Sequence, residues 1–238
     1  MKTVEEKLVK FKIDKKTYND WKSRLKTFEF EESAINRVIL RRGSSNTVNK
    51  LISIYPKLKD DFNHNQLISI AACSGGLRNL DAVKANYEAL RELEFTPEQM
   101  VAMVSHAGGS KNLDAVTANY KAFRRLEFTL EQMVTMVSHD GGSKNLEAVK
   151  ANYEVLRRLE FTPEQIVTMV SHGGGSKNLD AVKANYKALR RLEFTLEQMV
   201  AMVSHNGGSK NLDAVKANYK VLRRLEFTSE QIVTVVSK

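Results

Sequence analysis

A 33-residue sequence repeat constrains the fold of this chain more than any other feature. The segment that begins at Phe95 recurs without insertions at Phe128, Phe161 and Phe194. A diverged copy precedes it and keeps the GG, NLDAV and ANY motifs. The chain therefore divides into five full repeats, at residues 62–94, 95–127, 128–160, 161–193 and 194–226.

The segments on either side of these repeats keep less of the pattern. Residues 30–61 follow the same layout faintly, and residues 1–29 keep no obvious repeat. We expect residues 1–61 to form a basic N-terminal region with degenerate repeats. Residues 227–238 begin a further copy that stops at Lys238, and a stop inside a repeat suggests a truncated reading frame.

Each repeat is expected to fold into two helices. The run Thr-Pro-Glu-Gln at 96–99 supplies an N-cap, a proline at the first helical position and a capping-box partner. We expect Gly108 and Gly109 to end this helix, because glycine accepts positive φ values. A second helix is expected from about Ser110 to about Arg125, since apolar residues recur there at spacings of three and four: Leu113, Val116, Tyr120 and Phe123.

A unit of two short helices cannot bury its own apolar side, so neighbouring copies must stack. The sequence therefore predicts an all-α fold, an α-solenoid of two-helix repeats. A hydrophobic content of 42% and a charged content of 27% fit a soluble, folded chain, and no apolar run is long enough to span a membrane. The single cysteine, Cys73, excludes an internal disulfide and is compatible with a reducing compartment.

One position changes its chemistry from copy to copy, and this is the residue that follows Ser-His. It is Ala107, Asp140, Gly173 and Asn206 in the four close copies, and Ser74 in the diverged copy. The position is expected in the loop between the two helices, beside the glycine pair, where a backbone can approach a ligand closely. We interpret it as a reader residue on a constant platform; the alternative is free drift of an exposed loop.

These motifs resemble the repeats of the TAL-effector-like (TALE-like) DNA-binding family. The resemblance rests on Thr-Pro-Glu-Gln at 96–99, Ser-His-x-Gly-Gly at 105–109 and Leu-Asp-Ala-Val at 113–116, and it covers residues 62–238 well. It implies a right-handed superhelix that follows the DNA major groove, with one repeat per base of one strand. It also implies that the residue before each reader stabilises the loop by bonding to the loop backbone, a role for Cys73, His106, His139, His172 and His205.

The chemistry of the readers matches individual bases. Cytosine presents its N4 amino donor in the major groove, so the acceptor Asp140 fits cytosine. Gly173 leaves room for the thymine methyl group, and Asn206 can donate to the N7 of guanine, with adenine second. Ala107 and Ser74 specify a base only weakly. Read from the 5′ end as in the family, the expected target is 5′-N-N-C-T-G/A-3′.

Phosphate binding is expected beside the readers, because a helix that opens with glycines presents backbone N–H groups and a positive dipole end to an anion. A cation follows within the first turn of each second helix; the alternative is that these cations are ordinary solvated residues. The resemblance adds three residues of the degenerate repeat that would bind the DNA backbone without base choice, Arg41, Arg42 and Lys50. The expected phosphate-binding residues of the full repeats are Gly75, Gly76, Arg78, Gly108, Gly109, Lys111, Gly141, Gly142, Lys144, Gly174, Gly175, Lys177, Gly207, Gly208 and Lys210.

Two further features have simpler interpretations. Trp21 resembles, by location only, an aromatic residue that contacts the base before the target site in some family members, but a core tryptophan is the favoured interpretation. Arginine pairs near the ends of the second helices lie about 20 Å from the loops, so we expect them to stabilise the helix ends rather than to contact DNA. The pairs are Arg124-Arg125, Arg157-Arg158, Arg190-Arg191 and Arg223-Arg224.

Neither a catalytic nor a metal site is visible in the sequence, because one histidine per repeat is not a ligand cluster and no nucleophile–base set appears. We expect a non-enzymatic, cofactor-free monomer whose partner is double-stranded DNA, in keeping with a net charge of +9, and neither a small-molecule substrate nor a membrane. Two alternatives stay open: a tetratricopeptide-like protein-binding scaffold, and a helical-repeat RNA binder whose readers would lie on helices. The localisation is open between a bacterial cytoplasm and a host nucleus.

Overall fold

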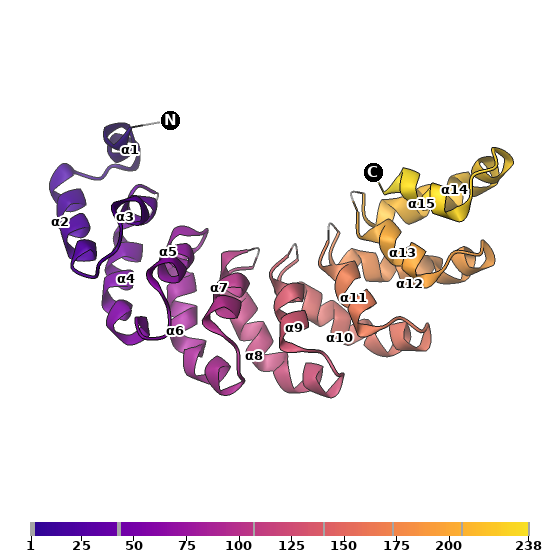
Figure 1. Ribbon diagram of the computed structural model, residues 1–238, viewed down its shortest axis with the longest axis horizontal. Helices are drawn as coiled ribbons and strands as arrows, with labels where there is room; N and C mark the ends of the chain where they lie inside the picture. The colour runs from indigo at the N-terminus through magenta and orange to yellow at the C-terminus, as the bar shows by residue number, and fades with distance from the viewer. Residues whose placement is uncertain are drawn as a thin grey trace. The chain divides into compact units, whose positions relative to one another are not determined.

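In the computed structural model, the regular structure of the described residues is entirely helical (Figure 1). The described ranges are 3–41, 44–106, 108–139, 141–172, 174–205 and 207–237. Within them fifteen helices follow one another with no β-strand. The predicted all-α fold is confirmed.

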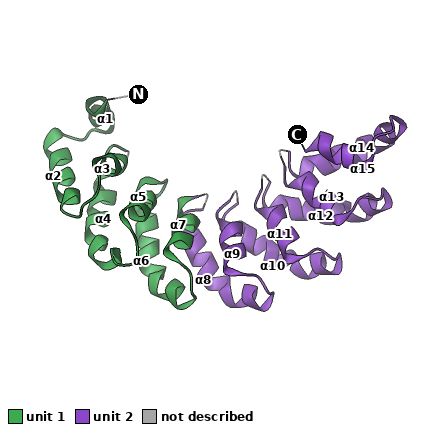
Figure 2. Ribbon diagram, viewed as in Figure 1, with its two compact units in different colours: residues 1–105 green, residues 106–238 purple. Residues whose placement is uncertain are grey.

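The helices fall into two compact units (Figure 2). Unit 1, residues 1–105, contains α1 (Val4–Phe11), α2 (Lys15–Lys26), α3 (Glu32–Ile39), α4 (Ser44–Leu58), α5 (His64–Ala72), α6 (Gly76–Glu92) and α7 (Pro97–Ser105). Unit 2, residues 106–238, contains α8 (Ser110–Arg125), α9 (Leu130–Val137), α10 (Ser143–Arg158), α11 (Pro163–Val170), α12 (Ser176–Arg191), α13 (Leu196–Val203), α14 (Ser209–Arg224) and α15 (Ser229–Val236). The division falls between the two helices of repeat 95–127.

The first helix of each full repeat from residue 95 onward begins with the capping box that its sequence predicts. In α9 the Thr129 hydroxyl accepts the backbone N–H of Gln132 at 3.1 Å, and the Gln132 side chain accepts the backbone N–H of Thr129 at 2.9 Å. These bonds satisfy two N–H groups that a helix start otherwise leaves unpaired. The same pair of bonds joins Thr96 to Gln99, Thr162 to Gln165, Thr195 to Gln198, and Thr228 to Gln231.

The glycine pairs begin the second helices, as expected, but they do not end the first ones, which corrects the other part of the expectation. The first helix α9 ends at Val137, whereas Gly142 is the N-cap of α10, with φ 53° and ψ −134°. After the C-cap Ser138, the ring of His139 donates to the Thr135 carbonyl, which is one of the last carbonyls of α9 that the helix itself leaves without a partner. The positive φ values expected of the glycines are present, with φ of 102° at Gly141.

The second helices carry the apolar stripe into the core. In α8, Leu113, Val116 and Phe123 are fully buried and Tyr120 is half-buried. Within unit 2 each second helix packs against the next, α8 on α10, α10 on α12 and α12 on α14, and the first helices α9, α11, α13 and α15 stack in the same way. This stacking is a helical-repeat solenoid with a 33-residue unit.

Each full repeat ends in a tight turn whose central residue is a left-handed glutamate. At the end of α10, the Glu160 N–H donates to the Arg157 carbonyl at 2.9 Å and the Phe161 N–H donates to the Leu156 carbonyl at 3.1 Å, which is a Schellman motif. Positive φ recurs at Glu94, Glu127, Glu160, Glu193 and Glu226, and also at Glu29. Residues 3–29 thus end as a repeat does, although their sequence shows no repeat pattern.

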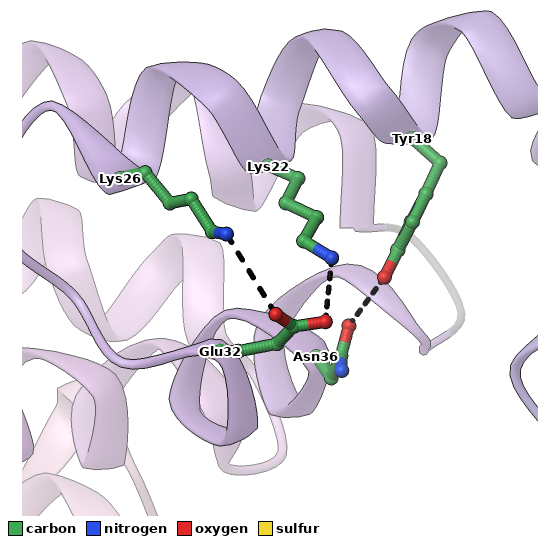
Figure 3. Close-up of polar contacts among 5 residues, drawn as sticks. All are labelled: Tyr18, Lys22, Lys26, Glu32 and Asn36. Carbon is green, nitrogen blue, oxygen red and sulfur yellow. Dashed lines mark hydrogen bonds and ion pairs between the residues drawn. The ribbon is translucent and has the colours of Figure 1, made fainter.

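The N-terminal helices are held together by polar contacts between α2 and α3 (Figure 3). Glu32 forms ion pairs with Lys22 and Lys26, and the Tyr18 hydroxyl donates to Asn36 Oδ1 at 2.8 Å. Trp21 is only 6% exposed, so its interpretation as a core residue is confirmed. Helices α2 and α3 are therefore joined both by packing and by polar contacts.

Candidate nucleic-acid interface

The N-terminal ends of the second helices in unit 2 lie along one edge of that unit (Figure 2). Of the five predicted reader residues, Ser74 is described and is exposed. The other four readers, Ala107, Asp140, Gly173 and Asn206, lie outside the described residues, as does Arg42. The geometry of the site therefore comes from the glycines, cations and histidines that flank the readers.

A depression of about 310 Å³ lies between two consecutive loops on this edge. It is lined by Gly141 and Lys144 of one repeat and by Gly174, Gly175, Ser176 and Lys177 of the next. Two lysines and two helix starts thus face one shared space. Positive ammonium groups and positive helix-dipole ends favour an anion there.

The helix starts differ from the open ends expected from the sequence. The Gly175 N–H donates to the His172 carbonyl at 2.9 Å, and the Lys177 N–H donates to the Gly174 carbonyl at 3.1 Å. These three-residue turns occupy N–H groups that were expected to be available to an anion. The helix dipole and the lysine side chains remain as the groups that can attract a phosphate.

The cations of the full repeats are available for such a contact. Lys111, Lys144, Lys177 and Lys210 are exposed, as is Arg78 in the diverged repeat. None of these five forms an ion pair with another residue in the described part of the chain. Among the described residues, each full repeat therefore presents next to its glycine pair one cation that has no ion-pair partner.

Of the three cations of the degenerate repeat that were expected to bind the DNA backbone, the two that the structure describes are engaged by the chain itself. Lys50 forms an ion pair with Asp81 of α6. The Arg41 guanidinium donates to the carbonyls of Ala71 and Cys73, at 2.8 Å each. Their predicted contact with phosphate would have to compete with these bonds.

The residues before the readers hold the loops from the side of the first helix. In three repeats the histidine Nδ1 donates to a carbonyl four residues earlier, in the last turn of the first helix and not in the loop itself. The bonds join His139 to Thr135 (2.8 Å), His172 to Thr168 (2.8 Å) and His205 to Ala201 (2.7 Å). His106 is exposed at the corresponding place, and the Cys73 thiol donates to the Ile70 carbonyl at 3.1 Å.

Comparison with family models decides what kind of repeat this is. The TAL effector repeat model matches residues 74–106 and 140–172. Each match runs from one reader to the residue before the next reader, in agreement with the 33-residue period. The chain carries TAL-effector-like repeats. No curated protein matches the chain.

Each full TALE-like repeat of this chain also contains a buried asparagine that the sequence-based site prediction lacks. Asn145 Nδ2 donates to the carbonyls of Met136 at 2.8 Å and of Val170 at 3.1 Å, so it bridges its own repeat and the next one. The corresponding residues are Asn79, Asn112, Asn178 and Asn211, and all five are at most 8% exposed. The sequence feature that could have predicted these asparagines is a constant polar residue beside the first leucine of the apolar stripe.

The arginine pairs of the TALE-like repeats stabilise the ends of the second helices, as predicted. The first arginine of each pair donates to the carbonyl of the phenylalanine four residues later. The bonds join Arg124 to Phe128 (3.1 Å), Arg157 to Phe161 (2.8 Å), Arg190 to Phe194 (3.1 Å) and Arg223 to Phe227 (2.9 Å). The second arginine of each pair is exposed.

Other kinds of site find little support in the described ranges. No group of three or more histidine, cysteine or carboxylate side chains there could hold a metal ion. Over the same residues, no helix is both long enough and apolar enough to cross a bilayer.

Proposed function

We propose that this chain is a sequence-specific binder of double-stranded DNA that places one TALE-like repeat on each base. TAL effector repeats form a non-enzymatic family that binds double-stranded DNA. The single observation that supports the proposal most is the depression shared by two consecutive loops, with Lys144 and Lys177 at its sides. A DNA strand presents one phosphate per base, and this array presents one such cation per repeat.

The arrangement of groups supports a division of labour within each loop. Phosphate contacts position a protein on a duplex, whereas contacts with base edges determine sequence. In the proposed complex the lysines hold the strand, and the reader beside each glycine pair faces a base edge in the major groove. The histidine bonds, such as that of His139 to Thr135, keep the loop base rigid while the reader is exposed to the groove.

The proposed target follows from the readers in chain order. Ser74 and Ala107 accept any base, Asp140 selects cytosine, Gly173 accommodates thymine, and Asn206 prefers guanine over adenine. The target is therefore 5′-N-N-C-T-G/A-3′, bound by a monomer without a cofactor or a chemical step.

Selection of bound duplexes from a random DNA pool tests this function directly. We expect an enriched motif that contains an adjacent C-T step. Enrichment of duplexes without that step would reject the base code and keep DNA binding. Tight binding to single-stranded RNA with no affinity for duplex DNA would instead favour the helical-repeat RNA reader.

A further inference from the structure

From residues 30–61 to residues 194–226, a side chain of each repeat donates to the same backbone carbonyl of the next repeat. The acceptor is always the tenth residue of the repeat, which ends or nearly ends the first helix, three residues before the reader. We call these contacts the loop ladder. Its members are Arg41 to Ala71 (2.8 Å), Asn79 to Val104 (3.1 Å), Asn112 to Val137 (2.9 Å), Asn145 to Val170 (3.1 Å) and Asn178 to Val203 (3.0 Å).

The asparagines of the loop ladder also hold their own repeat. Asn145 donates to Met136 of its own first helix at 2.8 Å, and Asn178 donates to Met169 at 2.8 Å. Asn112 adds a bond in the other sense, because its Oδ1 accepts the N–H of Ser143 at the start of the next second helix, at 2.9 Å. One amide group therefore connects the base of its own loop with the base of the next loop.

The asparagine and the first glycine of the pair are fitted to each other. A Cβ atom at Gly141 would lie 2.4 Å from Asn145 Oδ1, and the same contact would be 2.4 Å at Gly174 against Asn178. Both glycines have positive φ, of 102° and 103°. The chain thus passes directly over the buried amide, and a shift of the amide moves the glycine that adjoins the reader.

Arg41 takes the place of the asparagine at the first step of the loop ladder. The residue that corresponds to the asparagine in residues 30–61 is Thr47, whose side chain is shorter. Arg41 instead reaches Ala71, which is the equivalent acceptor, and its second donor reaches the Cys73 carbonyl at 2.8 Å. The link is therefore kept by a different side chain where the asparagine is missing.

We propose that the loop ladder keeps consecutive reader loops in register, so that each buried asparagine is a positioning residue for two bases. Asn145 positions the reader loops of Asp140 and Gly173. Asn112 and Asn178 do the same for the pairs of loops that they connect. The inference rests on the proposed function for its effect on base choice. Its structural part, the coupling of two loops, stands without DNA.

The test compares Asn145→Ala with Tyr153→Phe. The control variant removes another bond between repeats in the same second helix, since the Tyr153 hydroxyl donates to the Leu126 carbonyl at 2.9 Å, away from the loops. We expect Asn145→Ala to reduce the preferences for the C and the T of the motif by about fivefold or more, and the final G/A preference by less than about twofold. Tyr153→Phe should leave all three preferences unchanged.

Amide hydrogen exchange without DNA gives the second readout. In Asn145→Ala we expect the amides of Gly142 and Gly175, which bond within consecutive loops, to exchange at least about fivefold faster, and the amide of Gly109 to keep its rate. Equal loss of affinity for every sequence, or faster exchange in only one loop, would overturn the inference. A wild-type chain that binds no duplex would reject the proposed function, and the exchange rates would still decide on the ladder.

Discussion

The N-terminal pair α1–α2 and a regular repeat such as 161–193 end in the same kind of turn, but their second helices begin differently. Both second helices finish at a left-handed glutamate, Glu29 with φ 62° and Glu193 with φ 65°. However, α2 is capped by Asp14, whose carboxylate accepts the Thr17 N–H at 2.8 Å, whereas α12 starts at Gly175 without a side-chain cap. The Asp14 carboxylate therefore occupies the start of α2, whereas no carboxylate of the described residues caps the start of α12.

The cations follow the same contrast. In the N-terminal pair, Lys22 and Lys26 are paired with Glu32. In the regular repeats, Lys144 and Lys177 form no ion pair with any described residue and border a shared depression. The two regions therefore differ in whether the chain supplies its own counter-charges: the N-terminal pair does, and the regular repeats, within the described residues, do not, as the proposed binding of phosphate requires.

The largest effect is expected from adding a methyl group under a reader loop. Gly141→Ala places a Cβ 2.4 Å from Asn145 Oδ1 in a backbone with φ 102°, so strain and overlap should lower the free energy of unfolding by about 2–4 kcal/mol. In unit 1, Gly75→Ala meets Asn79 only at 3.4 Å with φ 83°, and should lower it by about 1 kcal/mol. Urea unfolding measures both. If the two variants lost the same free energy of unfolding, the Asn145 side chain would not constrain Gly141.

The next effect concerns one base. Asp140→Asn keeps the shape of the reader and replaces an acceptor by an amide, so the preference at the third base should move from cytosine toward purine by about 1–3 kcal/mol. The other bases should keep their preferences, because each loop meets its own base pair. Competition binding with single-base variants of the duplex measures this shift. Arg191→Ala, at the exposed end of a second helix, is the control, and uniform weakening in Asp140→Asn would reject the one-repeat, one-base code.

The salt dependence of DNA binding separates the two kinds of cation. For about five loop cations and the basic N-terminal region, we expect the logarithm of affinity to fall with the logarithm of salt concentration at a slope of about −5 to −7. Lys144→Ala should make the slope shallower by about 1, because it removes a phosphate contact. Arg41→Ala should weaken binding with little change in slope, since its guanidinium holds the carbonyls of Ala71 and Cys73. A slope change of about 1 in Arg41→Ala would instead identify Arg41 as a phosphate ligand.

Local sequence signals were enough to predict the helices and their stacking. The period, the Thr-Pro-Glu-Gln starts and the apolar stripe each act within one repeat, and the structure confirms all three. Contacts between repeats were harder to predict, because a bond from Asn145 to Val170 spans 25 residues and leaves no pattern except a constant polar residue. For the same reason the sequence predicts that Arg41 is available to bind DNA, whereas in the structure it donates to the backbone of the following repeat.

The smallest effect tests the shared ending of the two regions. A left-handed residue at the end of a helix is most stable as glycine, because a side chain adds strain at positive φ. Glu160→Gly, at φ 69°, should therefore raise the free energy of unfolding by about 0.5–1 kcal/mol, and Glu29→Gly, at φ 62°, should raise it by a similar amount. Thermal unfolding of the two variants measures the gain. If Glu160→Gly stabilises the chain and Glu29→Gly does not, the turn after α2 shares only its backbone angle with the turns that end the repeats. The N-terminal pair would then differ from a repeat at its end as well as at its helix start.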